Sequence, residues 1–518
     1  MTKFVHLMYG ATLALTACAA LAQQPVPPAP VAKVQPVTDT YFGEAIVDRY
    51  RWMENDKDPD WLPFLKQQNA HARGVLDALP RREVLLKRIE QLSGDVAAPA
   101  RVQQAGHLTF YQQRPAGANN FKLFVRDGRK PGKDRVLVDP TKLDTKGSHY
   151  SLDWWQPSPD GSKLVYGLSK DGSEDSVLQI MDVRSGAILK ERIADTQGAN
   201  PNWLDDSSGF FYNQLTGKVN TPERYLDSQV RFHKLGGKPE RDPVIMKRDL
   251  DPSVKYEKIQ SPYIGTAARS ATALLLLADV RPEQRVFSAP LADVVKGKAK
   301  WQAVAGFEDE ITGIDLHGDD LYLLSTKGHP RGRLLKTSAK APSLAGATEV
   351  VAESKLVLQG MARAKDGLYI RSMDGGIGKL QRLGADGKLV DIALPFDGTL
   401  RSVEADADAP GALAILSGWL EPAAIWSVGA DGKVSDTGIT PKPAIDTSAY
   451  TTERRFATAK DGTQIPYSLI YKKGLKMDGK NPAFISAYGS YGASAYTPSF
   501  ASRALALADQ GAIVGYAN

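Results

Sequence analysis

The stretch that decides the fold is KDGTQIPYSLIYKKGLKMDGKNPAFISAYGSYG, residues 460–492. It opens with an Asp-Gly turn, and the alternating segment 465–471 that follows predicts a β-strand. A second Asp-Gly turn leads into an apolar run, residues 482–488, which ends in glycines. Two strands of which the second is nearly all apolar are typical of a sheet buried on both faces. Such α/β folds place their chemistry beyond the carboxyl ends of strands, so the Gly/Tyr-rich loop is the candidate site.

The same stretch, through KDGT, IP, KKG, DG, PAF and YG in that order, resembles the start of the hydrolase domain of the prolyl oligopeptidase family. Residues 50–55, YRWMEN, resemble the N-terminal signature of that family. The resemblance covers nearly the whole chain. It implies a β-propeller followed by an α/β-hydrolase domain, with N-terminal helices that pack on the hydrolase domain. It also implies a serine-type endopeptidase that cleaves short, proline-containing peptides admitted by the propeller.

Between residues 96 and 440 the sequence consists of short strands separated by Gly, Asp-Gly and Pro-Asp-Gly turns. A turn followed by a compact apolar strand recurs seven times, at Tyr111, Tyr166, Tyr212, Leu276, Tyr322, Tyr369 and Ile415. Four of the six steps are 46 or 47 residues, a period typical of a β-propeller. We therefore predict a mainly β fold with seven blades, in which the aligned residues occupy like positions between neighbouring blades. An array of β-sandwiches is the alternative.

Composition excludes several classes of protein. The 518 residues exceed the size of one ordinary domain, and 42% hydrophobic with 24% charged residues is typical of soluble globular proteins. The net charge of +6 comes from 65 basic and 59 acidic residues, without a basic run. Nucleic-acid binding requires a concentrated basic patch, so we do not expect it. We expect a monomer.

Residues 1–22 are predicted to be an export signal. A lysine precedes an apolar stretch that ends in Ala-Leu-Ala before Gln23, which is a small-x-small cleavage pattern. The run is short and interrupted by polar residues, which argues against a membrane-spanning helix. Leu-Thr-Ala-Cys, ending at Cys18, resembles a bacterial lipobox, in which the cysteine is lipidated. Both routes remain open, so we expect an exported protein, periplasmic or secreted, that contacts a membrane only through a lipid on Cys18.

Two segments lie between the signal and the repeats. Residues 23–37 are rich in proline and predict an extended linker. Residues 38–95 predict a helical segment, with one helix after Asp58-Pro59 and a second over 81–92. Cys18 is the only cysteine, so the chain has no disulfide.

The candidate site residues are Tyr488 and Tyr491. In the family, a tyrosine at the position of Tyr488 donates its hydroxyl to the oxyanion, and an aromatic residue near Tyr491 lines the proline pocket. The usual Gly-Gly-Phe reads Ser490-Tyr491 after Gly489 here, so the resemblance is weaker at the pocket. The residues alone, without the resemblance, favour the interpretation that both tyrosines only pack at the end of a strand.

The rest of a serine peptidase site is absent from these residues. The 518 residues contain no G-x-S-x-G, the nucleophile elbow of α/β hydrolases, and no histidine follows His329. Residues 441–518 are therefore predicted to be the incomplete start of a hydrolase domain, without nucleophile, acid or base. The chain is then either a truncated peptidase or a non-catalytic exported propeller that binds peptides. An apolar strand without neighbours would be an aggregation hazard, which favours truncation.

We expect no metal and no cofactor. The histidines between residues 100 and 340 have no metal-binding spacing; they are His107, His149, His233, His317 and His329. The acidic run 404–408, EADAD, lacks the glycine and distal glutamate of an EF-hand loop, and we predict a solvated turn there.

Overall fold

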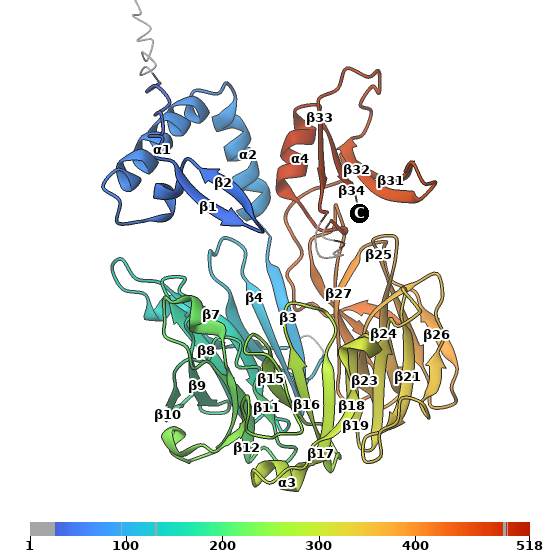
Figure 1. Ribbon diagram of the computed structural model, residues 1–518. Helices are drawn as coiled ribbons and strands as arrows, with labels where there is room; N and C mark the ends of the chain where they lie inside the picture. Colours follow the sequence, from blue (N-terminus) through green and yellow to red (C-terminus); the bar gives the residue numbers. More distant parts are fainter. Residues whose placement is uncertain (1–25, 95, 130–131, 490–493, 495, 518) are drawn as a thin grey trace, which may run out of the picture. The chain divides into compact units, whose positions relative to one another are not determined.

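The computed structural model describes residues 26–94, 96–129, 132–489, 494 and 496–517 (Figure 1). The export signal, Cys18 and Tyr491 lie outside these residues. The chain divides into two compact units, residues 1–89 and 90–518, and each is described separately. No helix in the described part of the chain is both long and apolar enough to cross a membrane.

The first unit contains a β-hairpin that we did not predict. Its strands are β1 (Val37–Tyr41) and β2 (Glu44–Asp48), joined by Phe42 and Gly43, both with positive φ. Both strands are largely exposed and lack an alternating apolar face, so their residues carry no strand signal. The predicted helices are present as α1 (Trp61–Asp77) and α2 (Arg82–Gly94), the second of which runs into the next unit.

Seven four-stranded antiparallel sheets follow one another between residues 98 and 436. Sheets one to four are β3 (Ala98–Ala105), β4 (Leu108–Arg114), β5 (Lys122–Asp127) and β6 (Arg135–Val138); β7 (Tyr150–Pro157), β8 (Lys163–Lys170), β9 (Val177–Asp182) and β10 (Ile188–Ile193); β11 (Asn202–Trp203), β12 (Gly209–Gln214), β13 (Gln229–Lys234) and β14 (Val244–Met246); and β15 (Ser261–Gly265), β16 (Thr272–Ala278), β17 (Arg285–Pro290) and β18 (Gln302–Ala305). Sheets five to seven are β19 (Ile311–His317), β20 (Asp320–Ser325), β21 (Arg333–Ser338) and β22 (Thr348–Val351); β23 (Val357–Ala364), β24 (Gly367–Asp374), β25 (Ile377–Leu383) and β26 (Leu389–Ile392); and β27 (Thr399–Ala405), β28 (Ala412–Ser417), β29 (Ala424–Val428) and β30 (Val434–Asp436). A short helix, α3 (Leu291–Val295), precedes β18.

The seven repeats found in the sequence are the second strands of the seven sheets. They are β4, β8, β12, β16, β20, β24 and β28, each hydrogen-bonded to a strand on either side. These strands are nearly all buried because both of their faces pack against a neighbouring sheet. The repeat therefore located one equivalent strand in every sheet.

Seven hydrophobic clusters join the sheets in sequence order and close them into a ring. The last cluster joins Tyr111 of the first sheet to Leu413 and Ile415 of the seventh. No strand is exchanged between these two sheets, so side chains close the ring. Burying a side chain of this size contributes about 1.5–3 kcal/mol, and each cluster contains several.

The prediction that the aligned residues occupy like positions is wrong. Tyr166 and Tyr212 each pack against the preceding sheet. Tyr166 belongs to the cluster that contains Phe110, and Tyr212 to the cluster that contains Val165. Tyr369 packs against the following sheet instead. Side chains alternate between the two faces of a strand, and a shift of one residue exchanges the faces. Because both faces are buried here, an aromatic residue can occupy either one.

The C-terminal segment forms one mixed sheet in the order β31 (Tyr450–Thr458), β32 (Gln464–Lys472), β34 (Ile513–Ala517) and β33 (Ala483–Ala487). β33 and β34 are parallel, and parallel neighbours need a crossover connection. The connection contains the helix α4 (Ser502–Asp509) (Figure 1). This helix buries its alanines and Leu505.

The prediction of a sheet buried on both faces is wrong for β33. Phe484 is 52% and Ile485 73% exposed, because β34 is the only strand beside β33 among the described residues. An exposed apolar edge of this kind is a template for pairing with a further strand.

Candidate functional site

Tyr488 is the first residue after β33, at the carboxyl end of the parallel pair β33 and β34. Its side chain is 47% exposed, and its hydroxyl has no hydrogen-bond partner among the described residues. Clefts beyond the carboxyl ends of parallel strands are where α/β folds bind ligands. The Tyr488 hydroxyl is thus free to donate a hydrogen bond, and its role at an oxyanion stays a prediction.

The segment that follows Tyr488 is held against the seventh sheet. The hydroxyl of Ser417, at the end of β28, donates a hydrogen bond of 3.2 Å to the carbonyl of Pro498. The Nη2 group of Arg401, in β27, donates one of 2.7 Å to the hydroxyl of Ser499. Both contacts join residues about eighty to a hundred positions apart in the sequence. They fix the far end of the loop that begins at Tyr488.

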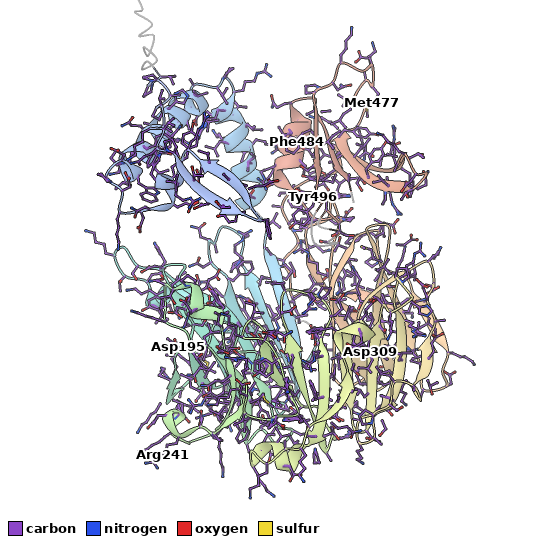
Figure 2. All side chains as sticks on the ribbon, in the orientation of Figure 1. Asp195, Arg241, Asp309, Met477, Phe484 and Tyr496 are labelled. Atoms are coloured by element: carbon purple, nitrogen blue, oxygen red, sulfur yellow. The ribbon has the colours of Figure 1, made fainter. Side chains whose placement is uncertain are left out.

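Three aromatic rings fix the end of β34 in the same region. Tyr516 stacks on Trp419, which lies between β28 and β29, with ring centres 4.7 Å apart and planes within 6°. Tyr496 packs against Tyr516, with the two ring centres 5.3 Å apart. Burial raises the pKa of the Tyr516 hydroxyl, so it stays protonated near neutral pH. Figure 2 shows Tyr496 between the ring of sheets and the sheet that carries Phe484.

Sequence reasoning missed these anchoring contacts. Ser417, Trp419 and Arg401 belong to the seventh repeat, and nothing in their spacing indicates a partner near residue 500. A tryptophan shortly after the last buried repeat strand was the only available signal. Tyr491 lies outside the described residues, so its predicted place in a proline pocket stays a prediction.

The histidines between residues 100 and 340 lie in the strands of the sheets or in the turns and loops beside them. Among the described residues, no group of three or more His, Cys, Asp or Glu side chains could hold a metal ion. His233 is fully buried in β13, where its Nδ1 lies 3.0 Å from the carboxylate of Asp242. The hydroxyl of Tyr212 donates to the same carboxylate at 2.9 Å. This histidine is therefore part of the packing of the third sheet.

The prediction of a solvated turn is wrong for the first residue of the acidic run. Glu404 lies in β27, and burial raises the pKa of its carboxyl group to about 7. The guanidinium of Arg101, in β3, opposes this shift. Arg101 is itself held over the ring of Trp155 at 4.6 Å and donates to the carbonyl of that residue at 2.6 Å. The charged side chains thus face a partly desolvated interior.

Replacing Glu404 with Gln should remove a pH dependence of stability. Between pH 4.5 and 7 the folded protein keeps the proton that the unfolded chain has released, so stability falls as pH rises through this window. The fall is at most on the order of 3 kcal/mol. We expect Glu404→Gln to match the wild type near pH 4.5 and to be more stable at pH 8. Urea unfolding at several pH values measures the free energy of unfolding, and Glu240→Gln, at an exposed position, is the control. If the free energy of unfolding of Glu404→Gln follows that of the wild type at every pH with a constant offset, the prediction is contradicted.

The chain is similar to a known protein family over most of its length. Residues 29–435 match the family model described as prolyl oligopeptidase, N-terminal beta-propeller domain. The match covers most of the chain, which therefore belongs to the prolyl oligopeptidase family. The predicted resemblance is confirmed, and the mainly β architecture matches the propeller fold of this family.

Individual relatives are similar over most of this chain. Prolyl endopeptidase of Elizabethkingia meningoseptica is 27% identical over 481 residues, which cover 88% of this chain and 63% of the relative. Dipeptidyl aminopeptidase BI of Pseudoxanthomonas mexicana is 24% identical over all of this chain and 72% of its own length. A solved prolyl endopeptidase structure is 25% identical with a TM-score of 0.84, covering 94% of this chain and 71% of that one. The chain thus spans about 63% of the length of the first of these relatives.

Proposed function

We propose that this chain is the propeller and oxyanion-donor portion of an exported serine-type endopeptidase that cleaves short, proline-containing peptides. The observation that carries the proposal is Tyr488, whose free hydroxyl lies beyond two parallel strands in a loop anchored to the ring of sheets. Relatives named prolyl endopeptidase support the choice of substrate.

In this proposal the seven sheets are the seven blades of the propeller, over residues 96–440. Residues 441–518 are the start of an α/β-hydrolase domain, and the Ser-Asp-His triad comes from sequence outside these 518 residues. Residues 1–22 are the export signal, 23–37 the linker and 38–95 the N-terminal segment. The peptidase acts as a monomer when the edge of β33 is covered.

The role of Tyr488 follows from its geometry. When a serine attacks a peptide carbonyl, negative charge develops on the oxygen, and a fixed hydroxyl donor stabilises that charge more than it stabilises the substrate. One such donor lowers the activation barrier by about 3–4 kcal/mol. The anchors at Ser417 and Arg401 hold the loop before the reaction, so little reorganisation is needed. The ring of sheets admits short peptides and excludes folded proteins.

A second candidate is a non-catalytic exported propeller that binds peptides. It is favoured by one observation, the lack of any G-x-S-x-G motif and of any histidine after His329 in the 518 residues. Reading the nucleotides after codon 518 separates the two functions. A G-x-S-x-G motif followed by an aspartate and a histidine, in any frame, supports the peptidase, and its lack supports the binding protein.

Export is proposed to proceed by signal cleavage before Gln23 or by lipidation at Cys18. If Cys18 is lipidated, the mature protein should incorporate labelled palmitate and partition with membranes. Cys18→Ala should then abolish the label, because no other cysteine exists in the chain. A soluble wild-type protein that begins at Gln23 would contradict lipidation.

A further inference from the structure

A pocket of about 280 Å³ lies where the sixth and seventh sheets meet the segment that follows Tyr488. Its lining includes Gln359, Arg371, Thr399, Arg401, Ser494 and Thr497. The last two residues belong to the connection between β33 and α4. The pocket therefore shares a wall with the loop that carries the proposed oxyanion donor.

Two β-bulges place polar side chains at this pocket. In β27, Leu400 and Ser402 pair with consecutive residues of β28, which leaves Arg401 as the extra residue. In β23 the same irregularity leaves Gln359 as the extra residue. Bulges re-aim side chains away from the regular alternation of a strand, and they occur often next to binding sites.

Both arginines of the pocket lack a carboxylate partner among the described residues. Arg371 donates to the side-chain oxygen of Gln359 at 3.3 Å, to its carbonyl at 3.2 Å and to the carbonyl of Leu400 at 3.3 Å. Arg401 donates to the hydroxyls of Ser417, at 3.2 Å, and Ser499. Residues 490–493 and 495, which lie outside the described residues, contain no acidic residue.

Two other arginines of the sheets have a carboxylate partner instead. Arg126 pairs with Asp134 at 2.5 Å, and Arg382 pairs with Asp366 at 2.7 Å. Desolvation lowers the pKa of both Arg371 and Arg401, and no nearby carboxylate offsets it. Arg371 is half-buried and Arg401 is exposed, so their removal from water is partial. Two guanidinium groups that lie together without an anion still favour an anionic ligand.

A third donor lies in the same wall. The hydroxyl of Thr399 is buried and has no hydrogen-bond partner in the described part of the protein. A buried hydroxyl usually finds a partner, and one that lacks a partner beside two guanidinium groups can donate to a bound anion.

We propose that this pocket binds a carboxylate of the peptide substrate, held by Arg371, Arg401 and Thr399. The planar guanidinium matches the two oxygens of a carboxylate and binds them through charge-assisted hydrogen bonds. The volume suits one residue with its carboxylate rather than a whole peptide. The peptide part of the proposal rests on the proposed function, and the anion site rests on the two arginines alone.

Calorimetric titration of the 518-residue chain tests the proposal. The probes are Gly-Pro-Ala with a free carboxylate, its C-terminal amide, the amide with an N-terminal succinyl group, and inorganic phosphate. We expect at least one carboxylate-bearing peptide to bind about tenfold more tightly than the plain amide. Arg371→Gln combined with Arg401→Gln should remove this difference between the carboxylate-bearing peptides and the amide. Arg192→Gln, an exposed arginine of β10, is the matched control and should change nothing.

The outcomes separate the anion site from the peptide function. Tighter binding of the free acid shows that the pocket takes a C-terminal carboxylate. Tighter binding of the succinyl peptide shows that it takes a carboxylate at the N-terminal end of the peptide. Phosphate binding that depends on both arginines, with no peptide bound, supports the anion site and contradicts the peptide function. Equal binding of all three peptides, or phosphate binding unaffected by the variants, overturns the proposal. If the double variant does not fold, Arg401→Gln alone decides, because that side chain is exposed.

Discussion

Residues 1–518, expressed as they stand, should hydrolyse no peptide. Acyl transfer of this kind needs a serine activated by a base, and a base oriented by a carboxylate. No histidine follows His329, so the segment from β31 onward has no histidine to act as base. His329 itself lies in the turn between β20 and β21, with Nδ1 3.3 Å from Glu353. Tyr488 can polarise a carbonyl, but no described residue beside it can attack.

The measurement is a fluorogenic, proline-containing peptide incubated with the purified chain, with a serine-directed fluorophosphonate probe in parallel. We expect neither turnover nor covalent labelling. The positive control is a longer protein that includes the residues encoded after codon 518, if these contain the G-x-S-x-G motif. Turnover that the probe blocks, with the label inside residues 23–518, would contradict this prediction. The chain would then contain a nucleophile outside any G-x-S-x-G motif.

The repeat pattern predicted the strands better than it predicted the residues. A turn followed by an apolar strand located β4, β8 and the five strands equivalent to them, because both signals are local. It aligned Tyr369 with Tyr166 although the two side chains pack on opposite sides of their sheets, because two-sided burial removes the alternation that would fix the register. The hairpin of β1 and β2 was missed for a related reason, since its exposed strands carry no apolar pattern.

The candidate site was predicted in part. The position of Tyr488 after an apolar strand was readable from the sequence, although its proposed role came from the family resemblance. The contacts that hold its loop, such as Arg401 with Ser499, join distant segments and depend on how the sheets close. Glu404 was taken for a turn residue because a run of acidic residues favours solvent, whereas β27 continues through it and removes it from water. Local composition cannot report burial of this kind.

Tyr488→Phe should lower the activity of the complete peptidase by about 10²- to 10³-fold in kcat. The change removes one hydroxyl and keeps the ring, so the end of β33 should keep its packing. The donor acts on charge that develops only in the transition state, and the KM should therefore change little. The assay is steady-state hydrolysis of a proline-containing peptide by the protein that contains both residues 1–518 and the nucleophile.

The matched control is Tyr496→Phe, which removes a hydroxyl from the same loop. Tyr496 contributes its ring to the stack with Tyr516, and its hydroxyl makes no hydrogen bond among the described residues. We expect its kcat to stay within about threefold of the wild type, well below the effect of losing an oxyanion donor. If both variants lose the same factor, the loop needs its tyrosines for shape, and Tyr488 is not an oxyanion donor. If Tyr488→Phe loses activity only in kcat and Tyr496→Phe keeps the wild-type activity, packing and substrate binding are unchanged. The lost activity is then explained by lost stabilisation of the transition state.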